Sequence, residues 1–424
     1  MRLRLRHPDS PVIRVLLSGA VVASLLSGCS SAASTTAPAQ SAAPAQCDTP
    51  YDSAVLDPRP IPASLDPVTA KPDIAQMTIK STDLGSNPEV SPQWYDTLQP
   101  TPDQVKQICG MHLKAVFLDW ADATYNQSIR SGVRQEFQAL GVDLVRITSF
   151  NFDPNGLAGA LAAVLPLNPD IIITGGTIDP NQMAAIMKPA ADKGITIVSW
   201  AVGAKGWETG KGKPIASVIS YDFFQLGKQM GAAVCKKYPN GAKLGYLHYI
   251  NNVDAILLRE EGFLEALKAC PKIEVIADGG PADPRGSNSG FSDPNAATND
   301  AAAFLARHSD INVLFAPWED PPGLGEMAAI KQSGLEGKID LVTMDLAETG
   351  ARQLATANGT IKVDMAQDVY DGGRTMALAG AMTKAGLDVP AFLIFPTYAA
   401  TNANLKDAWD FMHGPEYPLP VSTQ

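Results

Sequence analysis

The sequence predicts an α/β protein with two doubly wound parallel-sheet lobes. The first observation is that short apolar runs alternate with segments of helical periodicity along most of the chain. The second is that runs such as 170–173 are apolar at nearly every position, which is typical of strands covered by helices on both faces. The third is that the alternation occurs twice in 424 residues, a length that allows two or three domains.

The first series of elements begins at Lys114. Strands are expected at 115–118, 142–147, 170–173 and 195–199, and helices at 127–140, 157–165 and 181–193. Helices of this length can return the chain to the start of the next parallel strand. The series therefore predicts one doubly wound sheet.

A second series predicts another sheet of similar size. Helices are expected at 223–237, 255–269, 296–306, 325–332 and 370–385, and strands at 243–249, 273–277, 313–315, 341–344 and 361–365. Ligands of open α/β sheets bind beyond the carboxyl ends of the strands. Two such sheets that face each other can therefore line one shared cleft.

Residues 51–113 form a different kind of segment, rich in Pro and Asp and weakly periodic. We expect an extension that wraps around the lobes, with one short strand near 77–80 and little or no contribution to either core.

The N-terminus has the pattern of an export signal at residues 1–28. Four arginines precede a short apolar run at 15–26, which is shorter than the ~20 residues of a membrane-spanning helix. The ending Leu26-Ser27-Gly28-Cys29 resembles the bacterial lipobox, and that resemblance implies acylation of Cys29. An ordinary signal with a chance cysteine is the alternative.

Residues 29–50 are expected to be a flexible tether, because they are mostly Ser, Ala, Thr, Pro and Gln. The predicted location is the extracytoplasmic face of the cell membrane, through the lipid. The net charge of −11 becomes more negative once the arginine-rich signal is removed. Such a chain is a poor candidate for binding nucleic acid, which needs a basic face.

Five cysteines remain to be assigned. With Cys29 acylated, four are left in an oxidising compartment, and three pairings are possible. We expect Cys47–Cys109 and Cys235–Cys270, the second of which would join the ends of two consecutive helices. Free buried thiols are the alternative.

The chain has five His and no HExxH motif, so neither a metal nor a cofactor is expected. Gly323–Ala328 fits G-x-G-x-x-A only nominally, and we interpret it as a helix start.

Polar and aromatic residues gather where the predicted strands end. Aromatic rings can cover the C–H faces of a ligand, while carboxylates and amides pair with hydroxyl groups in fixed directions. The set therefore predicts a site for a small neutral hydroxylated ligand. Its members are Trp120, Tyr125, Asn126, Thr174, Trp200, Tyr221, Asp222, Asn252, Trp318, Glu319, Asp345 and Gln367.

From Lys114 to Trp409 the chain resembles the type I periplasmic sugar-binding proteins of ABC transporters, in particular the ribose-binding-like group. The stretches that carry the resemblance are 169–173, 191–195, 259–263, 342–345 and 366–368. It implies that Asp345 and Gln367 contact a sugar. It also implies that Tyr125 and Asn126 replace two sandwiching Phe, that Thr174 replaces a pocket Asn, and that Glu319, beside Trp318, replaces another Asn.

Two departures from the family pattern indicate a more aromatic and less charged pocket. Trp200-Ala201-Val202 stands where the family has an Asp-Arg pair. The family's sugar-binding Arg falls near Leu257, although Arg259 is close by. The ligand class therefore includes polyols and modified sugars as well as plain aldoses.

The resemblance further implies two lobes joined by three crossings, near Ser220, Gln367 and Phe392. Lobe 1 would comprise 114–220 plus 368–392, and lobe 2 would comprise 221–367 plus 393–424. The implied partners are a monosaccharide or polyol, an ABC permease, and the membrane through the lipid anchor, with the chain as a monomer.

Three other functions share some of these features. A lipid-anchored sensor could present its ligand to a membrane receptor kinase instead of a permease. Repressors of the LacI type share the core but carry a DNA-binding domain where this chain has the lipobox and tether. An exported hydrolase would need a nucleophile with a base in reach. His248 is the one His near a strand end, and we expect it within a strand as a packing or rim residue.

Overall fold

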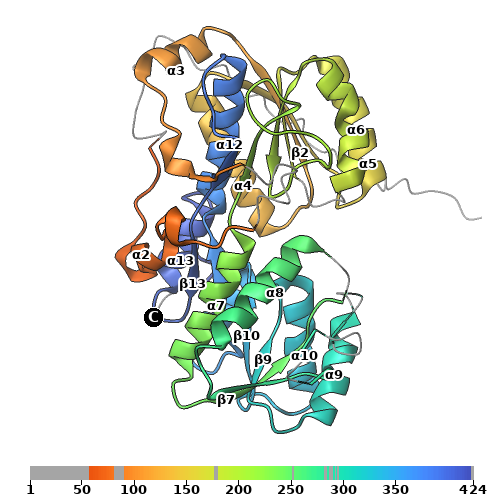
Figure 1. Cartoon of the computed structure of the whole chain (residues 1–424), viewed down its shortest axis with the longest axis vertical. Coiled ribbons are helices and arrows are strands. Elements are labelled where there is room, and N and C mark those ends of the chain that lie inside the picture. Colours follow the sequence, from red (N-terminus) through yellow and green to blue (C-terminus); the bar gives the residue numbers. More distant parts are fainter. Residues whose placement is uncertain are drawn as a thin grey trace, which may run out of the picture. The chain divides into compact units, whose positions relative to one another are not determined.

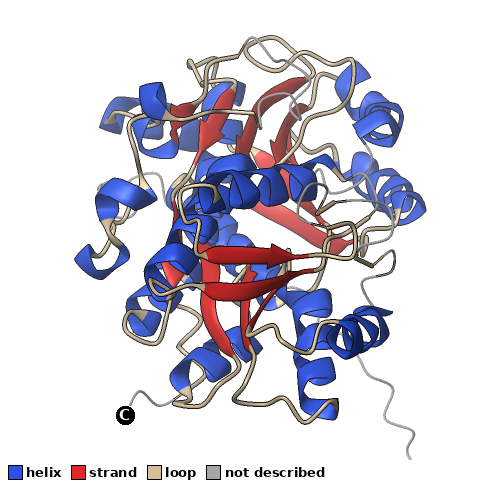
Figure 2. Ribbon diagram, turned by 60° about the horizontal axis from the view of Figure 1, so that its bottom comes forward, coloured by secondary structure: helices blue, strands red, loops and turns tan. Residues whose placement is uncertain are grey.

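The computed structural model describes residues 57–80, 90–175, 180–250, 253–280, 284–285, 290–291, 293 and 296–421. Within these ranges the chain forms a seven-stranded and a six-stranded sheet, both flanked by helices (Figures 1 and 2). The predicted α/β class with two parallel sheets is therefore confirmed. None of the helices in these ranges is long and apolar enough to cross a membrane.

The seven-stranded sheet has the order β1-β12-β6-β5-β4-β2-β3, and its strand pairs are parallel. Its strands are β1 (Gln93–Trp94), β2 (Lys114–Asp119), β3 (Asp143–Ser149), β4 (Ile171–Gly175), β5 (Thr196–Trp200), β6 (Ile215–Ser220) and β12 (Phe392–Ile394). The central strands are buried along their whole length because helices cover both faces.

The six-stranded sheet has the order β13-β11-β10-β9-β7-β8. Its strands are β7 (Ala242–Tyr246), β8 (Ile273–Ile276), β9 (Val313–Phe315), β10 (Asp340–Met344), β11 (Ile361–Gln367) and β13 (Thr397–Ala400). The pairs are parallel except β11 with β13, which is antiparallel.

Helices pack in layers against each sheet. On the seven-stranded sheet, α4 (Thr124–Ala139) packs with α12 (Val369–Lys384), and α5 (Pro154–Val164) packs with α6 (Pro180–Asp192). On the six-stranded sheet, α7 (Phe223–Lys237) packs with α8 (Asp254–Leu267), and α9 (Ala297–Arg307) packs with α10 (Leu324–Gln332). The shorter helices α11 (Glu348–Ala355) and α13 (Leu405–His413) lie near β11.

Sequence periodicity located most of these elements but missed several. No strand was expected between 199 and 223, where β6 lies in the middle of its sheet. Two of its six residues are Ser, which interrupt the apolar pattern in the sequence. Both are nevertheless buried, and their hydroxyls donate to the carbonyl oxygens of Pro390 and Tyr221. Helices α11 and α13 and strands β12 and β13, each of nine residues or fewer, were not predicted either.

The chain passes between the two sheets at three places. The first lies between β6 and α7, and the second between β11 and α12. The third was expected near Phe392, but Phe392–Ile394 pair with β6 in the seven-stranded sheet. It therefore falls at Phe395–Pro396, just before β13.

The segment before β2 contributes to the core, and the expectation that it adds little or nothing was wrong. Its apolar side chains, which include Leu65, Tyr95 and Ile108, are buried in the main hydrophobic cluster. It also supplies β1, which extends the seven-stranded sheet, and α3 (Pro102–Cys109), which begins with a capping box at Thr101. The strand expected near 77–80 is absent from those residues.

Arg59 fastens this segment to the second crossing. Its guanidinium donates to carboxylate oxygens of Asp368 at 2.7 Å and Asp371 at 3.2 Å, and to the carbonyl oxygens of Asp410 and Phe411 at 2.9 and 2.5 Å. It also lies 4.6 Å from the ring centroid of Tyr370. Because Asp368 is the N-cap of α12, one side chain joins the extension, the crossing and α13.

Arg59→Ala is expected to lower the unfolding free energy by about 2–3 kcal/mol, because it leaves buried Asp368 and Asp371 without this cation. Thermal unfolding followed by circular dichroism checks the loss. The matched control is Arg352→Ala, whose exposed ion pair should be worth less than about 1 kcal/mol. Equal, small effects of both substitutions would contradict the role of Arg59.

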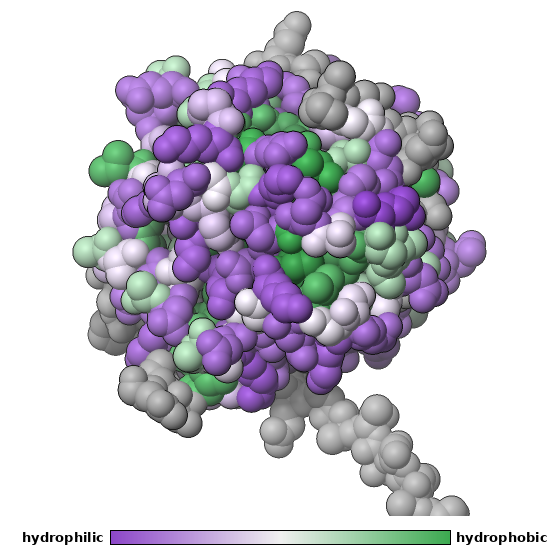
Figure 3. Space-filling model, turned by 90° about the horizontal axis from the view of Figure 1, so that it is seen from below, coloured by the Kyte–Doolittle hydropathy of each residue, from purple (hydrophilic) through white to green (hydrophobic). Residues whose placement is uncertain are grey.

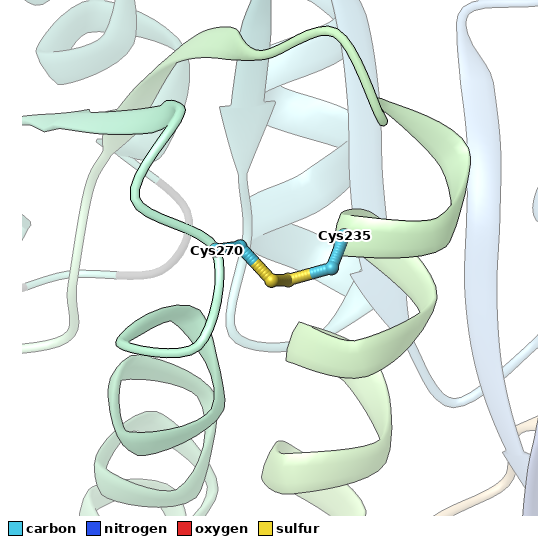
Figure 4. Close-up of a disulfide and its surroundings, with 2 residues drawn as sticks. All are labelled: Cys235 and Cys270. Carbon is cyan, nitrogen blue, oxygen red and sulfur yellow. A yellow bond between two sulfur atoms is a disulfide. The ribbon is translucent and has the colours of Figure 1, made fainter.

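The structure contains the predicted Cys235–Cys270 disulfide, with a Cα–Cα distance of 6.0 Å (Figure 4). It joins the end of α7 to the residues that follow α8. These helices approach closely because Gly227 and Gly262 face the partner backbone, where a Cβ would lie 1.9 or 2.0 Å from a carbonyl oxygen. Cys29 and Cys47 lie outside the described residues, so acylation and the Cys47–Cys109 pairing stay predictions.

The disulfide should appear in non-reducing peptide maps as one linked pair of peptides. It closes a loop over a separation of 35 residues, so replacing both cysteines by Ser should cost about 3–4 kcal/mol. Unfolding midpoints of the double variant and of the unreduced parent measure this loss. Free thiols at both positions in the parent would refute the link.

Candidate ligand site at the strand ends

The candidate site lies where strands of both sheets end. Trp120 follows β2 and Trp200 ends β5 in the seven-stranded sheet, whereas Asp345 follows β10 and Gln367 ends β11 in the six-stranded sheet. Tyr221 lies in the first crossing, between β6 and α7. Parallel strands place their carboxyl ends on the same sheet edge, which explains why these separate stretches meet.

An aromatic wall forms one part of the site. The Trp200 ring stacks between Trp120, at 5.9 Å between centroids, and Phe395, at 5.0 Å. Tyr125 meets Trp200 edge-on at 6.2 Å. The wall needs a glycine behind it, because a Cβ on Gly175 would lie 1.9 Å from a ring carbon of Trp120. The predicted aromatic residues of the first lobe are therefore in mutual contact.

A charged cluster forms the other part. Arg259 of α8 donates to both carboxylate oxygens of Asp345, at 3.0 and 2.9 Å, and to the carbonyl oxygen of Pro317 at 3.3 Å. The side-chain amide of Gln367 donates to Asp345 at 2.7 Å. Burial lowers the pKa of Arg259, but the charge of Asp345, together with Tyr221 and the hydrogen bonds to both residues, raises the pKa above its ordinary value. The cluster thus pairs one positive with one negative charge.

Tyr221 joins the charged cluster to the aromatic wall. Its hydroxyl accepts a hydrogen bond from Arg259, and its ring packs edge-on against Phe395 at 5.5 Å and Phe223 at 4.5 Å. Burial raises the pKa of the Tyr221 hydroxyl, which therefore stays protonated. Flat apolar surface and directed hydrogen-bonding groups consequently lie side by side.

Several polar atoms near these groups have no hydrogen-bond partner among the described residues. They include Thr174 Oγ1 at the end of β4, Gln367 Oε1 and Arg259 Nε, all of them buried. An unsatisfied buried polar atom costs about 1–3 kcal/mol. One acceptor, one donor and one hydroxyl can each bond to hydroxyl groups of a ligand.

Other predicted site residues make structural contacts. Asn126 donates to Asp119 at 2.6 Å, and Asp222 caps α7 by accepting from the Gln225 amide at 2.6 Å. Glu319 accepts from the backbone amides of Ala347 and Gly350. Trp318 packs in a separate aromatic group with Tyr249 and Phe291. Asn252 lies outside the described residues.

Two residues of the candidate site, Arg259 of the charged cluster and Phe395 of the aromatic wall, were absent from the predicted set. Arg259 lies two positions from where the resemblance placed the family's Arg, and only the orientation of α8 shows that its side chain reaches Asp345. Phe395 was missed because the third crossing was expected three residues too early. The sequence feature that could have identified Phe395 is an aromatic residue directly before Pro396.

His248 lies apart from this cluster. It follows the end of β7 by two residues rather than lying within a strand, and it is buried. Its Nδ1 is 3.9 Å from Glu260 Oε2, and burial raises the pKa of Glu260 to about 8. A cavity of about 430 Å³ lies beside it, lined in part by Leu257, Leu264 and Arg285. The described residues hold no group of three potential metal ligands.

Comparison with known proteins gives the class of the chain. A model of the periplasmic binding protein domain matches residues 114–386. The ribose import binding protein of Salmonella typhimurium is 27% identical over 247 residues, which cover 57% of this chain and 74% of that protein. The ribose import binding protein of Escherichia coli is 27% identical over 240 residues, with the same coverage.

Solved structures show the same fold. A solute-binding protein of an ABC transporter from Agrobacterium vitis, bound to α-D-tagatopyranose, superimposes with a TM-score of 0.60 at 20% identity. The match covers 72% of this chain and 100% of that protein. Another Agrobacterium vitis solute-binding protein, with bound allitol, gives 0.56 at 17% identity, covering 69% and 96%.

The chain belongs to the periplasmic binding protein family. The fold is that of the type I members, as the sequence resemblance predicted. The relatives are named as import binding proteins and not as enzymes, which agrees with the expectation of a binding function.

Proposed function

We propose that this protein binds a small neutral hydroxylated ligand, a monosaccharide or polyol, between its two sheets. One observation carries the proposal: the Trp200 aromatic wall lies beside the Arg259–Asp345–Gln367 cluster. The charges of Arg259 and Asp345 compensate each other, so the cluster offers no net charge to an ionic ligand. An uncharged ligand also avoids the cost of burying an unpaired charge.

Hydroxyl groups suit the polar half of the site. Asp345 accepts hydrogen bonds, and 24% of its side chain is exposed. Arg259 Nε can donate and Gln367 Oε1 can accept, which matches the dual capacity of a hydroxyl. The partly buried ring of Tyr125, which meets Trp200 edge-on, suits C–H surfaces of the same ligand. The tagatose, allitol and ribose in the names of similar proteins belong to this ligand class.

Binding is proposed to close the two sheets around the ligand. Contacts come from both sheets, and the three crossings are short enough to serve as hinges. A ligand that contacts both sheets favours the closed state, because only that state offers all of its contacts.

The further roles proposed from the sequence concern the membrane. The lipobox supports acylation of Cys29 and attachment to the extracytoplasmic face of the cell membrane, and the family supports delivery of the ligand to an ABC permease. We propose that the chain acts as a monomer. The face shown in Figure 3 is mostly hydrophilic, with separate small hydrophobic patches.

A carbohydrate and polyol panel tests the binding function on the full chain purified in detergent. One compound at 100 times its Kd should stabilise the fold by about 2.7 kcal/mol, measured as a rise in Tm by circular dichroism. Asp345→Ala should abolish the rise, because it removes the acceptor and leaves Arg259 unpaired. Asp310→Ala, which changes an exposed carboxylate, should keep it. A panel in which no compound raises Tm would refute the proposed ligand class.

A further inference from the structure

Asp345 lies on a backbone turn that needs support. Its φ is 91° and that of Leu346 is 23°, both positive values that residues other than glycine rarely adopt. Such conformations cost on the order of 1–3 kcal/mol each and persist when surrounding contacts enforce them. The direction of the Asp345 carboxylate therefore depends on whatever holds residues 345–347.

Three buried side chains hold this turn. Asp364 of β11 accepts a hydrogen bond from the Leu346 amide at 3.0 Å. Glu319 accepts from the Ala347 amide at 2.7 Å and the Gly350 amide at 2.8 Å, so it caps the start of α11. His413 of α13 contacts the Leu346 carbonyl oxygen at 3.1 Å through Nε2, and its Nδ1 is 2.7 Å from the Ser128 hydroxyl on α4.

Glu319 and Asp364 lie against each other. A Cβ on Gly350 would lie 2.3 Å from Asp364 Oδ2 and 2.4 Å from Glu319 Oε2, so both oxygens lie over the same glycine. The two carboxyls are within hydrogen-bonding reach of each other. Both side chains are fully buried. Two carboxylates this close in a buried site cannot both ionise readily, and one shared proton converts their repulsion into a hydrogen bond.

We propose that Glu319 and Asp364 share one proton and, in that state, act as positioning residues that hold Asp345 for ligand binding. The ligand effects rest on the proposed function, whereas the shared proton does not. Asp364 Oδ1 and both Glu319 oxygens bond to backbone amides, which leaves Oδ2 of Asp364 to donate the shared proton to Glu319. The sequence predicted that Glu319 contacts the ligand. In this proposal Glu319 instead holds the turn that orients Asp345.

The electrostatic surroundings favour the shared proton. Burial raises the pKa of both carboxyls, and the nearby Asp345 charge raises each of them further. Burial lowers the pKa of His413 to about 4, so this imidazole is neutral and offers no compensating charge. The other charged groups on the neighbouring elements include Arg259, which is paired with Asp345, the surface residues Glu348 and Arg352 of α11, and exposed Asp320. They also include buried Glu326 of α10, Lys362 of β11, which pairs with Asp340, and Lys406, Asp407 and Asp410 of α13.

The sign of the pH dependence follows from the raised pKa. The folded chain retains the shared proton at pH values where the unfolded carboxyls have lost theirs. Raising the pH from the unfolded pKa, near 4, to that of the folded pair therefore lowers stability. Once the pair ionises, two like charges repel under the turn, and ligand affinity should fall.

Asp364→Asn separates this role from simple packing. The Asn carbonyl can accept from the Leu346 amide, and its NH₂ group can donate to Glu319 in place of the shared proton. Affinity at pH 6 should stay within about twofold of the parent, and its decline at higher pH should disappear. Asp364→Ala should weaken binding about tenfold at every pH. Glu326→Gln changes another fully buried carboxyl, on α10, and should leave the parental pH profile intact.

The experiment measures Kd from pH 5 to 10 on the full chain, using the panel compound that gives the largest Tm shift. Infrared difference spectra of the same variants, without ligand, test for a protonated carboxyl band that Asp364→Asn removes and Glu326→Gln leaves in place. That band is expected even if no compound binds, so failure of the proposed function is distinguishable. The shared proton would be refuted if the Kd of Asp364→Asn changed with pH as the parental Kd does. A protonated carboxyl band that this substitution leaves unchanged would refute it as well.

Discussion

The ion pair between Arg259 and Asp345 is the interaction on which the candidate site depends. Taking two charges out of water costs several kcal/mol per ion, and this is offset only when the charges are paired and further hydrogen-bonded. Gln367, Tyr221 and the Pro317 carbonyl supply those further bonds. The pair consequently fixes α8, the turn after β10, the end of β11 and the first crossing relative to one another.

Support for this pair extends outward in two directions. Beneath Asp345, the buried carboxyls of Glu319 and Asp364 hold a turn with unfavourable backbone angles. Directly after Gln367, Asp368 caps α12 and binds Arg59 of the N-terminal segment. The segment before β2 therefore reaches the second crossing, one residue from Gln367 of the charged cluster. A hinge motion at that crossing must accommodate the Arg59 contacts.

Sequence patterns predicted the fold well because continuous apolar strands and long helices leave strong periodicities. They located the aromatic and acidic groups of the candidate site, such as Trp200 and Asp345, because strand ends are identifiable in sequence; that these groups contact a ligand stays a prediction. They could not predict which way a polar side chain turns after a strand. In the sequence Asp222 and Glu319 resemble ligand contacts, yet both accept hydrogen bonds from backbone amides in the first turn of a helix. The core role of the N-terminal segment was hidden because its short elements gain their stability from the sheet they join.

A crystal structure of the complex with a stabilising sugar or polyol would show directly whether the ligand binds at the Arg259–Asp345–Gln367 cluster. The C–H face of the ligand should lie against the aromatic wall beside Tyr125, and its hydroxyl groups should bond to Asp345, Arg259 and Gln367. Ligand density elsewhere, for example in the cavity beside His248, with the Arg259–Asp345 cluster untouched, would contradict it.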